Sequence, residues 1–166
     1  LSTGALFLLV GMLYERRHTR DFKDYGGLAA FLPVYSFFLV FIACSSMAVP
    51  GLNGFVGEFL ILFGAFKAHQ WWAGIAVLGV IFGALYMLSM VKQVLFGEVT
   101  AEENRGLKDV SFREWAAILP ICIFVVWLGV YPPSLLKKID ASLDQYWGRA
   151  MRKTSFDAKI PAEPDY

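Results

Sequence analysis

Apolar residues occur along this chain in long runs separated by short charged stretches, a pattern typical of helices that cross a membrane. Three of these runs cover about residues 1–14, 71–96 and 112–131. A helix rises about 1.5 Å per residue, so about 20 apolar residues span the hydrocarbon core of a bilayer. The sequence therefore predicts an all-α fold, a polytopic membrane helix bundle over residues 1–131.

The remaining apolar run, residues 33–67, is too long for one straight crossing, because it would reach about 50 Å as a single helix. Proline lacks an amide donor and glycine adopts unusual backbone angles, so both favour unwinding. The expected break residues are Pro50, Gly51, Gly54 and Gly57. We expect a discontinuous helix broken near residues 50–54. Unwound backbone at membrane depth needs protein or water around it, which indicates a polar path inside the bundle.

The end of the chain has a different pattern. Ser111 and Glu114 fit a capping box that starts the last span, and Pro132-Pro133 ends it. Beyond this point apolar residues recur every three to four positions, which is typical of an amphipathic helix. We expect residues 132–166 to form such a helix along the membrane surface, followed by a polar tail.

Composition supports a membrane protein and excludes several other classes. Hydrophobic residues make up 57% of the chain and charged residues 17%, with a net charge of +1, so neither disorder nor a nucleic-acid partner is expected. Cys44 and Cys122 lie inside apolar runs and indicate no metal site. Phosphate loops, dinucleotide fingerprints and cysteine clusters do not occur, so we expect no redox cofactor on this chain. Because Leu1 begins directly inside an apolar run, we expect a fragment whose first span has lost upstream turns.

The candidate chemistry of the chain narrows to Glu58. It lies nine residues before Lys67, or about 14 Å along a helix, which places it near the middle of the membrane. A carboxylate there is normally paired, neutral or part of an ion route, so Glu58 is predicted to be a proton relay group. The alternative is a structural glutamate that accepts hydrogen bonds from unwound backbone at Asn53 or Gly54.

Four other polar residues are candidates for a supporting role. Ser45 and Ser46 would line water or cap a half-helix, although serines in membrane helices commonly bond back to their own backbone. Asn53 lies in the expected break. Lys92 would snorkel to the interface or, with a partner helix, lie on a polar axis.

Several motifs in this order and spacing resemble a known family. They are Leu13-Tyr14-Glu15-Arg16, His18-Thr19-Arg20, Gly26-Gly27-Leu28, Val49-Pro50-Gly51 and Gly54-Phe55-Val56-Gly57-Glu58-Phe59. Together they resemble the C-terminal part of the antiporter-like membrane subunits of respiratory complex I, and within that family the subunit M group and its mitochondrial chain 4 counterparts. The resemblance extends from Leu1 to about Tyr131.

The resemblance implies a proton-translocating subunit of NADH-quinone oxidoreductase in a bacterial inner membrane, with a mitochondrial location as the weaker alternative. Glu58 matches the glutamate at the end of the second broken helix, while the other relay residues would lie upstream of Leu1. The partners would be neighbouring antiporter-like subunits, and NADH, flavin, iron-sulfur clusters and quinone would be bound elsewhere in the complex. Two alternatives remain open: a subunit of a multi-subunit cation/proton antiporter, which shares the same glycine-rich pattern, and a structural membrane scaffold.

Overall fold

A computed structural model describes the chain except for residues 98, 100–103, 105, 141–142, 144–145 and 147–166. The chain forms two compact units, Leu1–Val130 and Tyr131–Tyr166. In the second unit, residues 133–140 are helical. The expected amphipathic helix continues into residues that mostly lie outside the described part of the chain, as does the polar tail.

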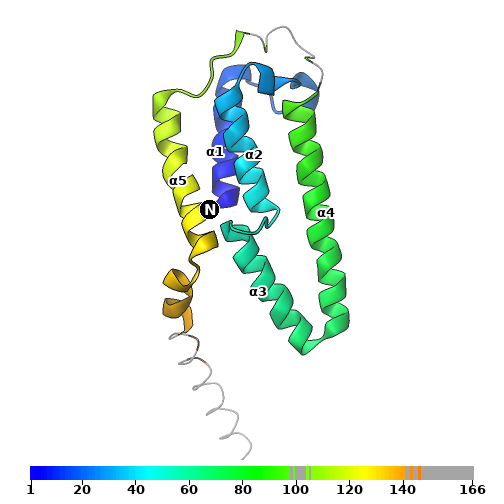
Figure 1. Ribbon diagram of the computed structural model, residues 1–166. Coiled ribbons are helices and arrows are strands. Elements are labelled where there is room, and N and C mark those ends of the chain that lie inside the picture. The colour runs from blue at the N-terminus through cyan, green and yellow to red at the C-terminus, as the bar shows by residue number, and fades with distance from the viewer. Residues whose placement is uncertain (98, 100–103, 105, 141–142, 144–145, 147–166) are drawn as a thin grey trace, which may run out of the picture. The chain divides into compact units, whose positions relative to one another are not determined.

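The first unit is a helical bundle, and its described residues form no strand (Figure 1). Its α-helices are α1 (Ser2–Arg17), α2 (Pro33–Ser46), α3 (Asn53–Ala68), α4 (Gln70–Leu95) and α5 (Phe112–Val130), with short 3-10 helices η1 (Phe22–Asp24) and η2 (Leu28–Ala30). Both α4 and α5 are long and apolar enough to cross a membrane, and α2 is a shorter apolar helix. The fold class is thus all-α, as the sequence predicts.

Helices α2 and α3 follow one another in the same direction, and α4 returns beside both of them (Figure 1). The 14 residues of α2 and the 16 residues of α3 reach about 21 and 24 Å, while the 26 residues of α4 reach about 39 Å. The interruption between α2 and α3, residues 47–52, therefore lies level with the middle of α4.

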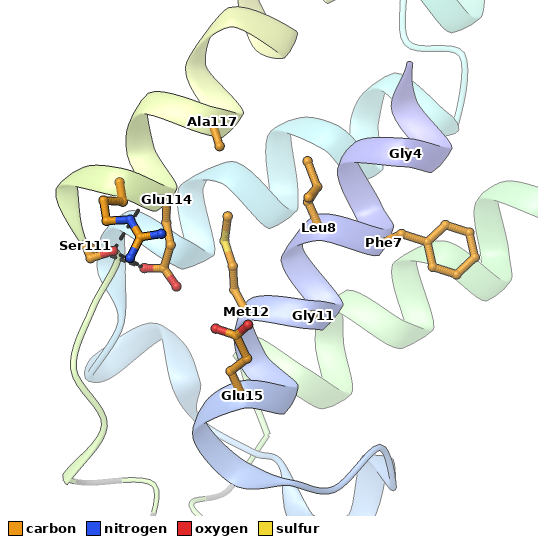
Figure 2. Close-up of a pocket in the computed structure, with 10 residues that line it drawn as sticks. Gly4, Phe7, Leu8, Gly11, Met12, Glu15, Ser111, Glu114 and Ala117 are labelled. Atoms are coloured by element: carbon orange, nitrogen blue, oxygen red, sulfur yellow. Dashed lines mark hydrogen bonds between the residues drawn. The ribbon is translucent and has the colours of Figure 1, made fainter.

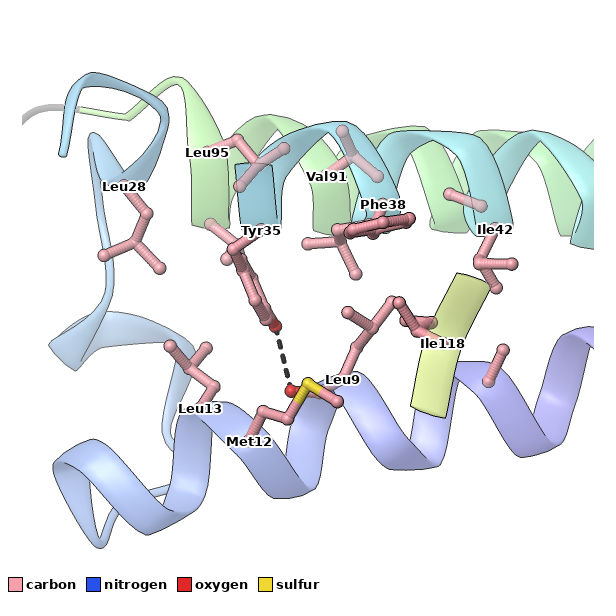
Figure 3. Packing of buried hydrophobic residues seen from close by; sticks show 14 of the residues in the cluster. Leu9, Met12, Leu13, Leu28, Tyr35, Phe38, Ile42, Val91, Leu95 and Ile118 are labelled. Carbon is pink, nitrogen blue, oxygen red and sulfur yellow. Dashed lines mark hydrogen bonds between the residues drawn. The ribbon is translucent and has the colours of Figure 1, made fainter. Parts of the chain in front are cut away.

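The core of the bundle lies between α1, α2, α5 and the last turns of α4 (Figure 3). Helix α1 buries one face at the three-to-four spacing of an amphipathic helix, with Ala5, Leu9, Met12 and Leu13. Tyr35 of α2 lies in this core, and its hydroxyl donates a hydrogen bond of 3.1 Å to the Leu9 carbonyl. Burial of the tyrosine ring therefore leaves its polar end paired.

Most apolar side chains of α3 and α4 face outwards. Helix α3 has no buried residue, although it packs against α4 and α5. At the turn between α3 and α4, Trp71 is 89% exposed and Trp72 is 68% exposed. An apolar surface of this extent is expected where lipid or another protein surrounds the bundle.

Candidate functional site

The break between α2 and α3 is built by two consecutive turns that its sequence favours. Two residues after α2 ends, Ala48 is in the left-handed region at φ 55°, and the Val49 amide donates to the Cys44 carbonyl at 3.1 Å, which is a Schellman ending. The Leu52 amide then donates to the Val49 carbonyl at 3.2 Å. With Pro50 and Gly51 at its centre, the second turn is of type II, since Gly51 has a φ of 91°.

These turns place the break at residues 47–52, slightly before the predicted position. Pro50 and Gly51 lie within it, as expected. Gly54 and Gly57 do not, because both lie inside α3. The two turns are complete before Asn53. Helix α3 therefore begins at Asn53, before Gly54 and Gly57, and includes both glycines.

Three polar side chains from three helices meet at the break. Ser45 lies in the last turn of α2 and is fully buried, and its hydroxyl donates to the Asn53 side-chain oxygen at 2.6 Å. Ser2 of α1 donates to the same oxygen at 3.1 Å, and its hydroxyl lies 2.8 Å from the Ser45 hydroxyl. We call Ser2, Ser45 and Asn53 the polar triad. It ties both half-helices to α1 through satisfied hydrogen bonds.

Two glycines allow other segments to approach the break closely. Gly54 faces the Ser45 carbonyl oxygen so tightly that a β-carbon on it would collide with that oxygen. Gly129 of α5 faces the Gly51 carbonyl in the same way. Both contacts are between backbones, which cannot move aside as a flexible side chain can. The break is therefore enclosed by α1, α2, α3 and α5.

Glu58 lies on α3, one helical turn beyond Gly54 and thus on the same helix face. The side chain is partly buried, and one of its carboxylate oxygens is fully shielded and receives no hydrogen bond from the described residues. The hydroxyl of Ser46 is also shielded and unpaired among these residues. Buried polar atoms are normally paired, so an unpaired carboxylate oxygen marks a position with a demand for a proton, a cation or water.

Of the other predicted polar residues, some lie at the break and one does not. The structure brings Ser45 and Asn53 into direct contact, and it adds Ser2, which sequence reasoning missed. Lys92 is exposed near the end of α4. Its neighbours Val91 and Leu95 pack beside Phe38 and Tyr35 in the first half of α2, so Lys92 lies away from the break (Figure 3).

A second polar centre lies at the opposite end of α1. Arg16 forms a two-pronged ion pair with Glu114 of α5, with distances of 2.8 and 2.7 Å. Its remaining N–H groups donate to the backbone carbonyls of Met12, Lys108 and Asp109. The hydrogen bonds that Arg16 donates to the Glu114 carboxylate raise the pKa of Arg16, so the guanidinium stays charged.

The same end of the bundle contains two helix caps. Asp109 accepts hydrogen bonds from the Val34 and Tyr35 amides at 2.9 and 3.1 Å, which caps α2. The Ser111 amide donates to the Glu114 carboxylate at 2.7 Å, and the Glu114 amide lies 3.5 Å from the Ser111 hydroxyl. The predicted capping box is thus confirmed. We call Arg16, Asp109 and Glu114 the loop-end clamp, since it joins α1, α2 and α5.

A cavity of about 730 Å³ lies between α1 and α5 beside this clamp (Figure 2). Small residues of α1, Gly4 and Gly11, line it together with apolar side chains. Glu15 and Glu114 lie at one end of it, and Leu8 and Ala117 lie further along (Figure 2). Within the described residues, no group of three or more His, Cys, Asp or Glu side chains is arranged to hold a metal ion.

A helical bundle with an outward apolar surface and two helices long enough to cross a membrane is characteristic of a membrane protein. Comparison with known proteins identifies the family within this class. The family described as "NADH:quinone oxidoreductase/Mrp antiporter, TM" matches residues 1–83, which is half of the chain. The chain therefore belongs to this family.

Individual relatives agree with the family match. NADH-quinone oxidoreductase subunit M from Rickettsia conorii is 39% identical over 142 residues, and the same subunit from Rhodobacter capsulatus is 40% identical over 141 residues. NADH-ubiquinone oxidoreductase chain 4 from Marchantia polymorpha is 41% identical over 143 residues. The matches cover 86%, 85% and 86% of this chain, but 29%, 28% and 29% of the relatives.

A solved structure shows the same fold. A chain of respiratory complex I from Thermus thermophilus with bound NADH is similar with a TM-score of 0.73 and 38% sequence identity. The similarity covers 79% of this chain and 27% of that chain. This chain thus spans less than a third of the length of the relatives that it matches.

Proposed function

We propose that this chain is the C-terminal part of a proton-translocating membrane subunit of NADH-quinone oxidoreductase. The observation that carries the proposal is the shielded carboxylate oxygen of Glu58, which lies one turn beyond Gly54 on α3 and has no hydrogen-bond partner among the described residues, in a member of this family. The relatives from Rickettsia and Rhodobacter are subunits of that enzyme by name. A bacterial inner membrane is the proposed location.

In this proposal Glu58 takes up and releases a proton, and the surrounding helices keep the proton route in place. A carboxylate in a low-dielectric position is neutral or charged according to whether a cation or water faces it, so changes nearby can drive proton exchange. The polar triad keeps the break enclosed and its hydrogen bonds satisfied. Neighbouring antiporter-like subunits are the proposed partners.

The proposal assigns the redox chemistry to other subunits. The sequence has no dinucleotide fingerprint, phosphate loop or cysteine cluster, which supports placing NADH, flavin, iron-sulfur clusters and quinone elsewhere in the complex. Quinone reduction in those subunits would supply the free energy, and this chain would contribute a proton route.

The test uses the complete protein in its assembled complex, with Glu58 replaced by Gln. Gln keeps the size of the side chain but cannot exchange a proton, so NADH-driven proton uptake into sealed vesicles should fall to a small fraction of the wild-type rate, and coupled quinone reduction should fall with it. Glu15→Gln is the matched control, since Glu15 is an exposed carboxylate at the loop end of α1. It should leave both rates unchanged.

Three outcomes separate the candidate functions. Normal rates in Glu58→Gln, with normal assembly, would contradict a relay role. Loss of assembled complex with unchanged pumping per complex would favour a structural scaffold. The family also contains Mrp antiporters, so Na⁺/H⁺ exchange by vesicles lacking NADH would favour a cation/proton antiporter.

A further inference from the structure

A second cavity, separate from the break, lies between α1, α2 and α4. Its volume is about 260 Å³, below the range of about 300 to 1,000 Å³ that small-molecule sites usually have. Its walls are apolar and come from three helices: Leu6, Val10 and Leu13, then Leu39, then Met90 and Val94. We call this cavity the apolar slot.

The residues that line the apolar slot follow the helix axes. Its α1 residues are spaced four and three positions apart, so they form one stripe about 10 Å long from Leu6 to Leu13. Met90 and Val94 form a matching stripe of one turn on α4. Val10 is among the exposed apolar residues, so the slot opens to the outside of the described helices. A narrow space of this shape suits one flexible hydrocarbon chain lying parallel to the helices.

The loop after α1 closes one end of the slot and carries a positive charge. Thr19 and Arg20 line this end, and Arg20 is exposed. The Arg20 guanidinium lies 4.7 Å from the centre of the Tyr14 ring, which holds the side chain against α1. The Thr19 hydroxyl donates a hydrogen bond to the nearby Asp24 carboxylate at 2.6 Å. This carboxylate therefore already has a hydrogen-bond partner. Arginine at the end of an apolar slot complements a phosphate group attached to a hydrocarbon chain.

The position of the slot across the membrane also suits a phospholipid. Its cationic end is the loop end of α1, where charged residues from Glu15 to Asp24 mark the membrane boundary. Its apolar end points towards the middle of α1. Lipid headgroups and acyl chains are arranged in this order across a bilayer.

We propose that the apolar slot binds one membrane phospholipid, with an acyl chain between α1 and α4 and the phosphodiester group against Arg20. This site is independent of Glu58, and its occupant would fill a gap in the outer wall of the bundle. The interaction combines burial of an acyl chain with one charge-assisted contact to phosphate.

The experiment uses the complete protein in its complex, reconstituted into vesicles of phosphatidylethanolamine and phosphatidylglycerol. A small fraction of the phosphatidylglycerol carries a photoactivatable group in its acyl chain. After irradiation, mass spectrometry maps the lipid adducts. We expect adducts on Leu39, Met90 or Val94 above the level found on Phe82, an exposed residue of α4 outside the slot.

Two variants test the slot and its charge separately. Val10→Phe fills the slot and should remove most of the adduct, whereas Val77→Phe, at a similarly exposed position of α4, should not. Arg20→Gln should lower the adduct about fivefold, whereas Arg113→Gln, which removes another exposed arginine, should leave it unchanged. Assembly of each variant is checked by the amount of complex in the membrane.

Two results would overturn the proposal. Adducts on slot residues that are no more frequent than on Phe82, or that persist in Val10→Phe, indicate ordinary contact with surrounding lipid. A complete lack of adducts in the slot of the assembled wild-type complex indicates that a neighbouring protein helix fills it instead.

Discussion

Glycines near the break have different physical roles although they look equivalent in the sequence. Gly54 is required because its backbone lies against the Ser45 carbonyl, and Gly129 is required because its backbone lies against Gly51. Gly57 lies three residues beyond Gly54 on the same helix, and among the described residues no atom outside its chain neighbours and helix backbone lies within 4 Å of where its β-carbon would be. A single methyl group should therefore have opposite effects at Gly54 and Gly57.

We predict that Gly54→Ala destabilises the protein by about 2 kcal/mol, because the added methyl forces α2 and α3 apart. Gly57→Ala should instead be neutral or stabilising by up to about 1 kcal/mol, since alanine favours helix and meets no neighbour. Denaturant titration of the full-length protein in detergent micelles measures both changes. Equal stability of the two variants would show that the contact between Gly54 and Ser45 is not tight.

The sequence predicts part of the candidate site at this scale. Ser45 and Asn53 stand out as polar residues beside a Pro-Gly pair in an apolar region, and the structure brings them together. Ser2 and Gly129 do not stand out, because their importance depends on contacts with residues 43 and 78 positions away in the chain. No local pattern indicates such contacts. The relay role of Glu58 stays a prediction.

At the scale of the helices, length and aromatic residues together suggest how the bundle sits in a bilayer. Trp72 and Lys92 are 20 residues apart on α4, or about 30 Å, which equals the thickness of a typical hydrocarbon core. Lys67 lies beside the same turn, with its ammonium group 4.6 Å from the centre of the Phe63 ring. Exposed tryptophan and lysine side chains are characteristic of the membrane interface.

We therefore predict that Trp71 and Trp72 lie at headgroup level. In vesicles of brominated phosphatidylcholine, bromine near the headgroup should quench their fluorescence more than bromine deep in the acyl chain. The difference between wild type and Trp71→Phe/Trp72→Phe isolates this signal in the full-length protein. Phe82→Trp supplies a deep reference, since Phe82 is exposed ten residues further along α4. Equal quenching of both positions by deep bromine would contradict the placement.

The helices themselves are largely predictable, because long apolar runs and capping residues act locally. Ser111 and Glu114 identify the start of α5, and Pro50 and Gly51 identify the turn between α2 and α3. The exact resumption of the helix at Asn53 is less predictable, since it depends on how the two turns pack against Ser45 and α5. The loop-end clamp is also hidden in the sequence, because Arg16 and Glu114 are 98 residues apart.

At the scale of the whole bundle, two polar centres hold the same helices at different depths. The loop-end clamp and the polar triad both include α1, where Arg16 and Ser2 are 14 residues, or about 21 Å, apart. Apolar core residues such as Leu9 fill the distance between them. Each centre has its own hydrogen bonds and shares no side chain with the other.

This separation predicts how substitutions combine. Arg16→Lys keeps the charge but loses the two-pronged geometry, and should cost about 2 kcal/mol; Ser45→Ala should cost about 1 kcal/mol. Their effects on the free energy of unfolding should add to within about 0.5 kcal/mol, because distant sites without shared partners behave independently. Ser45→Ala and Asn53→Ala should instead be coupled by about 1 kcal/mol, since they remove the same hydrogen bond.

Double-mutant cycles on the full-length protein measure both coupling energies, the one between Arg16 and Ser45 and the one between Ser45 and Asn53. Coupling above about 0.5 kcal/mol between Arg16 and Ser45 would mean that the clamp and the break move together, as they would if the charge state at the loop end altered the enclosure around Glu58. Additivity would mean that the break responds to groups nearer to it. In that case changes in the proton route should act at the shielded oxygen of Glu58 and at the Ser46 hydroxyl, neither of which has a hydrogen-bond partner in the described part of the chain.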